Sequence, residues 1–185
     1  MDKYYQAFKE IKGNRDIVFK TILDYFNRKS IDILEIGCAR NLNTSSRQSD
    51  GWSTCFWADY ICKNGGFLDI YDIDKKSTDN CRQLISAWLD KPEFDHSYDI
   101  EINNKECPLD IEQYNLVFLD GGDDPIETLK QYDFFKGRGV ILINDFHTKG
   151  RLIKDKSDTL WRFENGHELA CFGGPKLGVV ELKLL

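Results

Sequence analysis

The sequence has no apolar run long enough to cross a bilayer and no segment laid out as a secretory signal. A membrane-spanning helix needs about 20 consecutive apolar residues. Residues 1–5, MDKYY, lack the basic and then apolar order that an export signal has. We therefore expect neither a membrane protein nor a secreted one, and we expect the chain to reside in the cytoplasm.

The sequence also lacks internal repeats, low-complexity tracts and linkers rich in Pro, Gly or Ser. A chain of 185 residues is long enough for one hydrophobic core to form without disulfides or metals. We therefore expect a single domain over residues 1–185, with an N-terminal helical segment over residues 1–30.

An excess of basic residues is missing too, since the formal net charge is -6 and the pI is near 5.1. Phosphate binding requires a basic face, so nucleic acid is not expected as a partner. The 6 cysteines show no CxxC spacing, which structural zinc sites prefer, and we expect reduced, mainly structural thiols. No feature of the sequence indicates an oligomeric state.

What the sequence does contain is an alternation of buried-strand and helix patterns up to residue 144. The expected strands cover residues 31–37, 67–73, 98–102, 114–120 and 139–144. The expected helices cover residues 14–29, 53–64, 77–89 and 124–135. Ser77 is the expected cap of the third helix, although Asp74 is an alternative, and Asp124-Pro125 opens the fourth.

The tail has a different pattern, because three strand-like segments follow one another at residues 159–163, 169–172 and 177–184. Gly173-Gly174-Pro175 separates the last two, which predicts a hairpin. The expected fold is therefore α/β: a Rossmann-like three-layer sandwich whose mostly parallel seven-stranded sheet ends in a C-terminal antiparallel hairpin.

Glycine or aspartate stands at the end of four expected strands, as Gly37, Asp72, Asp120 and Asp145. Each has an ordinary structural interpretation as a strand end, a helix cap or a turn residue. Together they are more informative, because open α/β sheets bind ligands beyond the carboxyl ends of their strands. A glycine there allows close backbone approach, and a carboxylate can accept hydrogen bonds from both hydroxyls of a ribose.

The order of these segments resembles class I S-adenosylmethionine-dependent methyltransferases. It is carried by Leu34–Gly37, Trp52–Ala58, Asp72–Asp74, Val117–Gly121 and Gly139–Asp145. More narrowly, it is similar to the small-molecule branch that includes macrocin O-methyltransferase, the cephalosporin hydroxylase-like proteins and catechol O-methyltransferase.

The resemblance implies a set of residues that bind S-adenosylmethionine. This set consists of Glu35, Gly37, Cys38, Ser53, Asp72, Ile73 and Asp120. Of these, Glu35, Gly37 and Cys38 would line the methionine end of the cofactor. Asp72 would bind its ribose, Ile73 would pack on its adenine, and Asp120 would lie beside the reacting methyl group.

The sequence also departs from the family pattern. The glycine-rich turn usually contains further glycines, but Ala39 and Asn41 follow Gly37 here, and a polar insert covers residues 42–51. In metal-dependent members, the positions that match Asp120 and Asp145 hold Mg²⁺, but the third metal position is Phe146, which cannot ligate.

The resemblance implies methyl transfer to a small molecule at a hydroxyl oxygen, which must lose its proton during attack. Asp145 or His147 would serve as general base, with Asp120 beside the reaction, or Mg²⁺ held by Asp120 and Asp145 would lower the pKa of the hydroxyl. Two other classes remain open: a non-catalytic S-adenosylmethionine-binding protein and a nicotinamide-dependent oxidoreductase. The second lacks its G-x-G-x-x-G fingerprint, since Ala39 and Leu42 occupy glycine positions.

Overall fold

The computed structural model describes residues 15–43, 53–89, 99–109, 114–122, 124–137, 139–144, 160–162 and 169–173. Its helices are α2 (Arg15–Tyr25), α3 (Ser53–Asn64), α4 (Lys75–Trp88) and α5 (Pro125–Phe135). Its strands are β1 (Ile33–Ile36), β2 (Phe67–Tyr71), β3 (Asp99–Asn103), β4 (Leu116–Leu119), β5 (Gly139–Ile143), β6 (Leu160–Arg162) and β7 (Leu169–Gly173). None of these helices is both long enough and apolar enough to cross a membrane.

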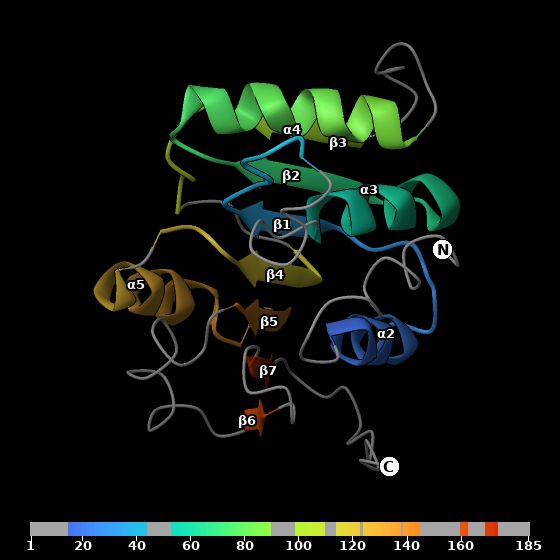
Figure 1. The fold of residues 1–185 in the computed structure, drawn as a ribbon. Helices are drawn as coiled ribbons and strands as arrows, with labels where there is room; N and C mark the ends of the chain where they lie inside the picture. Colours follow the sequence, from blue (N-terminus) through green and yellow to red (C-terminus); the bar gives the residue numbers. More distant parts are fainter. Residues whose placement is uncertain are drawn as a thin grey trace.

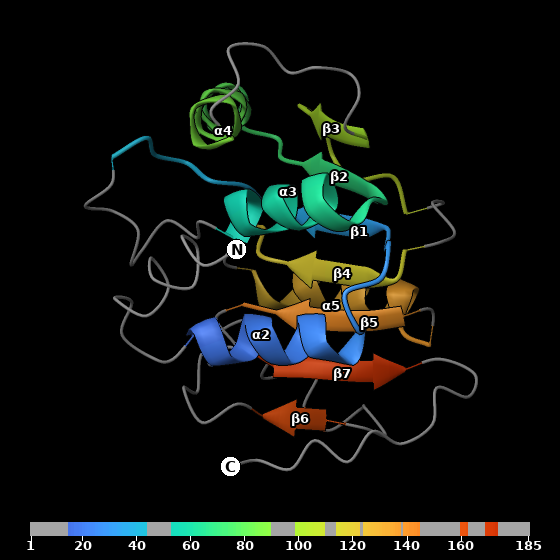
Figure 2. The same ribbon diagram turned by 90° about the vertical axis from the view of Figure 1, so that its right-hand side faces the viewer.

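The strands form one sheet in the order β3-β2-β1-β4-β5-β7-β6. Strands β1 to β5 run parallel to one another. Strand β7 is antiparallel to β5, and β6 is antiparallel to β7 (Figure 2). The chain order reverses between β1 and β4, so this is the topological switch point of the sheet. The α/β, Rossmann-like expectation is confirmed, and its parallel part has five strands.

The C-terminal part of the chain, for which a hairpin was predicted, contributes the strands β6 and β7. The expected hairpin joined residues 169–172 to residues 177–184, but the second of these segments lies outside the described residues. In the described part, β7 pairs with residues 160–162 instead. The predicted hairpin therefore stays a prediction.

Helices cover both faces of the sheet (Figure 1), and each face has its own apolar core. Side chains of α2, α3 and α4 pack on the face that carries Ile33, Leu68 and Phe118. Side chains of α5 pack on the opposite face, which carries Leu34 and Val117. The alternation follows from strand geometry, because successive side chains point to opposite faces.

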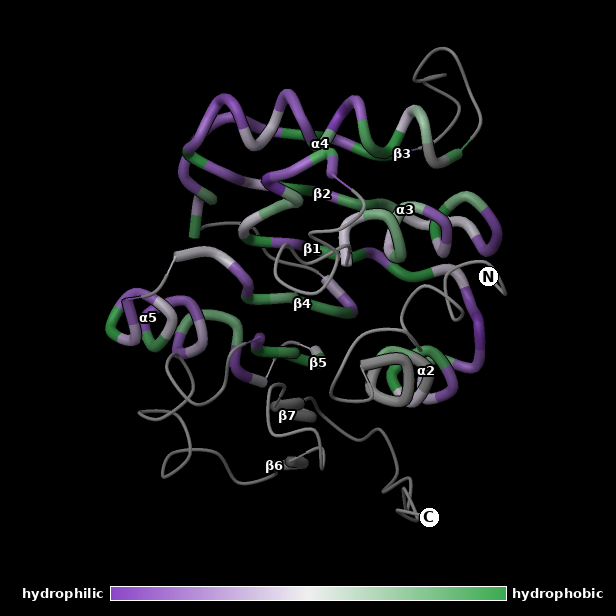
Figure 3. The backbone as a smooth tube through the Cα atoms, viewed as in Figure 1, coloured by the Kyte–Doolittle hydropathy of each residue, from purple (hydrophilic) through white to green (hydrophobic). Residues whose placement is uncertain are grey.

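Whole strands are buried at the centre of the molecule, and most of their residues are apolar. All residues of β1 and β4 are buried, and the tube in Figure 3 is green along β4 and β5 while α4 is mostly purple. Helix α3 is buried over residues 53–61, as is typical of a helix enclosed by its neighbours. Burial on both faces explains why continuous apolar runs predicted these strands.

The structure corrects two helix boundaries. Helix α4 begins at Lys75 and its cap is Asp74, whose carboxylate accepts hydrogen bonds from the main-chain nitrogens of Lys76 and Ser77. The Ser77 hydroxyl, expected as the cap, instead donates to Asp74 at 2.7 Å. The first helix was expected to reach residue 29, but α2 ends at Tyr25 because the following turn has positive φ at two residues.

One buried carboxylate lies within the sheet, outside the edge that carries the predicted site. Asp69 is 7% exposed, and it accepts a hydrogen bond from the Tyr114 hydroxyl. Burial raises the pKa of Asp69, and Glu101 beside it on β3 raises this pKa further, while Tyr114 and Lys105 oppose the shift. The Asp69 carboxyl therefore binds a proton more readily in the folded chain than in the unfolded one.

This raised pKa predicts how Asp69 changes stability with pH. Its contribution is fully present below the ordinary pKa of an aspartate and is lost as the pH rises through the raised pKa. Asparagine does not titrate in this range, so the stability of D69N relative to the wild type should rise as the pH increases above the ordinary pKa of an aspartate. Urea unfolding of both proteins across this range measures the difference, and a difference independent of pH would contradict the prediction.

Candidate functional site

Three of the predicted site residues lie side by side at the carboxyl edge of the sheet. Ile36 is in register with Tyr71 of β2 and with Leu119 of β4. The residues that follow are Gly37, Asp72 and Asp120, and main-chain hydrogen bonds connect them to the neighbouring strand ends. The Gly37 N–H donates to the Tyr71 carbonyl at 2.8 Å, and the Asp120 N–H donates to the Ile36 carbonyl at 2.8 Å.

Gly37 allows the loops after β1 and β4 to meet. Its φ is +90°, and a Cβ atom there would lie 2.6 Å from the main-chain nitrogen of Gly121 and 2.7 Å from the carbonyl carbon of Asp120. Both contacts are with main chain, which cannot rotate away as a side chain does. Gly37 is therefore required by the protein itself, at the switch point of the sheet.

Cys38 joins the β1 loop to the carboxylate that follows β2. The Cys38 N–H donates to Asp72 Oδ2 at 3.2 Å, and the Cys38 thiol lies 3.5 Å from the same oxygen. The other carboxylate oxygen, Asp72 Oδ1, accepts from the Asp74 N–H at 2.8 Å. The Asp72 carboxylate is thus oriented by main-chain donors from two loops and remains half-buried.

The thiol of Cys38 stays neutral in this environment. Hydrogen bonding with Cys81 raises its pKa most, followed by burial and by the nearby carboxylates of Asp72 and Glu35. The thiolate is the reactive form of cysteine, so Cys38 is not suited to act as a nucleophile. Its thiol serves as a donor to Asp72.

Glu35 and Ser53 lie beneath the edge. Both are 0% exposed, and the Ser53 hydroxyl donates to Glu35 Oε1 at 2.7 Å. The neighbouring Thr54 hydroxyl accepts from the Ala39 N–H at 3.3 Å. In this structure, Glu35 and Ser53 connect β1 to the start of α3 and thereby support the loop that carries Cys38.

Ile73 is the opposite case, because this large apolar side chain is 74% exposed just after Asp72. Leaving so much apolar surface in water has a cost that a ligand with a flat apolar face would remove. The Ile73 side chain is therefore accessible to a ligand at this edge, and its contact with adenine stays a prediction.

Asp120 faces a polar partner from the next strand. The side-chain amide of Asn144, the residue after β5, donates to Asp120 Oδ1 at 2.5 Å. The Asn144 N–H continues the sheet by donating to the Leu119 carbonyl. Asn144 therefore fixes the Asp120 carboxylate at the far side of the switch point from Asp72.

The predicted general bases, Asp145 and His147, lie outside the described residues. The predicted metal pair therefore includes only one described ligand, Asp120. Within the part of the chain that the structure describes, no three His, Cys, Asp or Glu side chains are arranged to hold a metal. The Mg²⁺ prediction has no support from these residues.

The structure also reveals polar residues that the sequence patterns did not identify. Asn144 is one, and Asn104, which binds the loop after β2, is another. The only available signal was position, since Asn144 is the last residue of one predicted strand and Asn104 lies two residues after another, and position does not identify a hydrogen-bond partner on another segment.

Comparison with known proteins identifies the fold. No protein-family model matches the sequence, and no curated protein matches it either. A magnesium protoporphyrin IX methyltransferase from Synechocystis PCC 6803 with bound SAM is similar in structure, at 10% identity and a TM-score of 0.55, over 88% of this chain and 80% of that one.

Two other solved structures have comparable scores. An RNA methyltransferase from Salinibacter ruber in complex with S-adenosyl-L-homocysteine has 13% identity and a TM-score of 0.53, over 88% of this chain and 94% of that one. A ribosomal protein L11 methylase from Lactobacillus delbrueckii subsp. bulgaricus has 12% identity and a TM-score of 0.52, over 83% and 76%.

Several more distant matches are longer than this chain. It spans 46% of a SAM-dependent methyltransferase from Geobacter sulfurreducens, for example, with a TM-score of 0.43. At these identities, structural similarity shows the fold alone. The chain has the Rossmann-like fold that methyltransferases of diverse substrates use.

The close main-chain contact at Gly37 predicts that even an alanine at this position destabilises the protein. G37A should lose roughly 3 kcal/mol or more in free energy of unfolding, since it combines positive φ with overlap on rigid main chain. The matched control is G137A, where φ is +80° but nothing lies within 4 Å of the added Cβ. That change should cost only about 1 kcal/mol, from backbone strain alone. Denaturant unfolding of both variants measures this, and equal losses would contradict the contact.

Proposed function

We propose that the protein is an S-adenosylmethionine-dependent methyltransferase that acts on a small molecule at a hydroxyl oxygen. The observation that carries the proposal is the Asp72 carboxylate, held by the Cys38 N–H beside Gly37 at the switch point of the sheet. Ligands of open α/β sheets bind at this place. The similar solved structures with bound SAM or S-adenosyl-L-homocysteine support the same cofactor.

The edge offers a suitable contact for each part of that cofactor. Asp72 would accept hydrogen bonds from the ribose hydroxyls, and exposed Ile73 would pack on the adenine. The main chain at Gly37 and Cys38 would approach the methionine part, supported from below by Glu35 and Ser53. Bound there, the cofactor would supply an activated methyl group on a sulfonium.

Methyl transfer from a sulfonium is an in-line displacement, so the protein contributes mainly by alignment. The Asp120 carboxylate, fixed by Asn144, would lie beside the reacting groups and orient the acceptor hydroxyl. The proton of that hydroxyl would pass to Asp145 or His147 as general base. Asn144 is a positioning residue in this scheme because its side-chain amide donates to the Asp120 carboxylate.

The proposed acceptor is inferred from the charge of the chain and from the polar side chains at Asp120. A net charge of -6 is unfavourable for binding nucleic acid, and a polar carboxylate and amide pair suits a hydroxyl substrate. By their names, the similar structures are methyltransferases of a porphyrin, of RNA and of a ribosomal protein. Incubation with methyl-labelled S-adenosylmethionine and separate panels of phenols, sugars, RNA and ribosomal protein distinguishes these classes.

The cofactor assignment predicts the effect of removing the ribose-binding carboxylate. D72A should weaken binding of S-adenosyl-L-homocysteine at least about tenfold, because hydrogen bonds to a charged acceptor are lost. D74N is the matched control on the same turn, since asparagine caps a helix as well as aspartate does. Isothermal calorimetry measures both affinities. If D72A binds as tightly as the wild type, the cofactor assignment is wrong.

The catalytic assignment predicts a different signature for Asp120. D120N keeps the shape of the side chain but removes its charge, so kcat should fall at least about tenfold, and by a larger factor than the affinity for S-adenosylmethionine. D124N on the same loop is the control, since Asp124 only caps α5. Single-turnover assays with the accepted substrate separate the two effects. A protein that binds the cofactor tightly but methylates no member of any panel would favour the non-catalytic alternative.

A further inference from the structure

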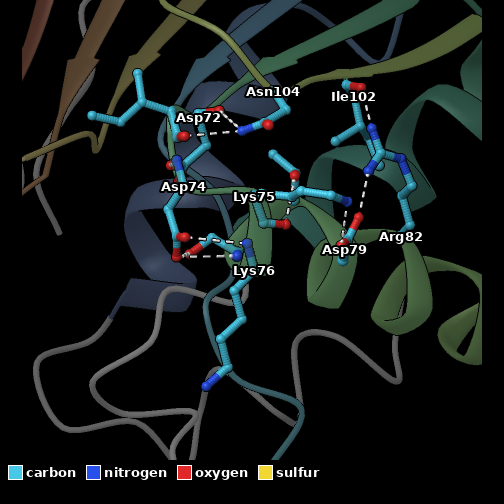
Figure 4. A network of polar contacts seen from close by, with 11 residues as sticks. Asp72, Asp74, Lys75, Lys76, Asp79, Arg82, Ile102 and Asn104 are labelled. Carbon is cyan, nitrogen blue, oxygen red and sulfur yellow. Dashed lines mark hydrogen bonds and ion pairs between the residues drawn. The ribbon is translucent and has the colours of Figure 1, made fainter.

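Asn104 connects the loop after β3 to the turn that carries Asp72. β3 ends at Asn103, which is in register with Tyr71, so Asn104 lies level with Asp72 at the carboxyl edge. Its side-chain nitrogen donates to the carbonyl of Asp72 at 3.2 Å and to that of Ile73 at 2.9 Å. Figure 4 shows this one amide directed at both carbonyls.

These two hydrogen bonds fix the main chain on which the Asp72 carboxylate depends. The Asp72 N–H already donates to the Asn103 carbonyl at 3.1 Å, so the peptide group before Asp72 is held by the last residue of β3 and the one after it by Asn104. The carboxylate then accepts from the Asp74 N–H of the same turn at 2.8 Å. Rotation of either held peptide group would move both the carboxylate and Ile73.

The loop that holds the turn is itself held. The Arg82 guanidinium on α4 donates to the Ile102 carbonyl at 2.7 Å, two residues before Asn104, and it also pairs with Asp79 (Figure 4). Helix α4 thus fixes the end of β3, and β3 presents Asn104 to the turn after β2. The main chain that carries Asn104 is therefore held in place by α4.

From this geometry we infer that Asn104 is a positioning residue, which sets the Asp72-Ile73 turn for the ribose and adenine of the cofactor without itself being the ribose ligand. The inference rests on the proposed function, because it assigns Asn104 a role in that same site. The side-chain amide supplies two donors, and both carbonyls require donors. An aspartate of the same shape supplies none when it is ionised.

The position of Asn104 makes the inference testable apart from folding. The side chain is exposed, so shortening it opens no cavity in either apolar core. An exposed asparagine at the opposite edge offers a matched control, because Asn115 Oδ1 accepts from the Asp32 N–H at 2.8 Å. N115A removes a comparable side-chain to main-chain contact, far along the strands from Asp72.

The experiment is a double-mutant cycle in which calorimetry measures the affinity for S-adenosyl-L-homocysteine. The proteins are the wild type, N104A, D72A, N104A/D72A and N115A, with N104D as a second way to remove the donors. N104A should weaken binding about tenfold, N104D by at least as much, and N115A by less than about twofold. The double variant should lose less affinity than the sum of the two single losses, because part of the effect of N104A acts through Asp72 and neighbouring residues of this kind are not additive. Thermal unfolding confirms that each variant is folded.

Each other outcome has a distinct meaning. If D72A binds normally, the proposed function itself fails. If D72A weakens binding but N104A and N104D do not, Asn104 does not position the turn. If the effects of N104A and D72A add in full, Asn104 contacts the ligand independently, and the positioning role is overturned.

Discussion

The candidate site depends on the close approach of two main-chain segments, those that leave β1 and β4. Asp120 and Gly121 pass through the space that a side chain at position 37 would fill. This contact at the reversal of strand order fixes the β1 loop, and the Cys38 N–H is directed at Asp72 as a result. The carboxylates after β2 and β4 are then presented on either side of one loop. The absence of a side chain at Gly37 therefore determines how these loops are arranged more than any polar contact does.

Much of the fold could be predicted because its strands are buried on both faces. The continuous apolar runs of β4 and β5 are too short for buried helices, so a buried strand is the remaining interpretation. The start of α5 could be predicted too, because aspartate followed by proline has a defined role at a helix end. Boundaries were less accurate where several residues compete. Asp74 and Ser77 both favour a helix start, and the main-chain N–H groups of Lys76 and Ser77, which donate to the Asp74 carboxylate, identify Asp74 as the cap.

The site residues that could be predicted are those that directly follow a strand, because their place in the chain puts them at the carboxyl edge of the sheet. Gly37, Asp72 and Asp120 each follow an apolar run, and parallel register brings them together. Their partners could not be predicted, since Ser53 is 18 residues from Glu35 and Asn144 is 24 residues from Asp120. Such pairs depend on the order of strands in the sheet. A residue pattern within one segment contains no information about that order.

The environment of Asp72 explains why a ribose would suit this edge. The described residues give its carboxylate two main-chain donors and a thiol, and no ion pair. A carboxylate has about four acceptor positions, and a thiol is the weakest of these donors. A ribose hydroxyl would therefore take the remaining position or replace the thiol, without breaking a salt bridge.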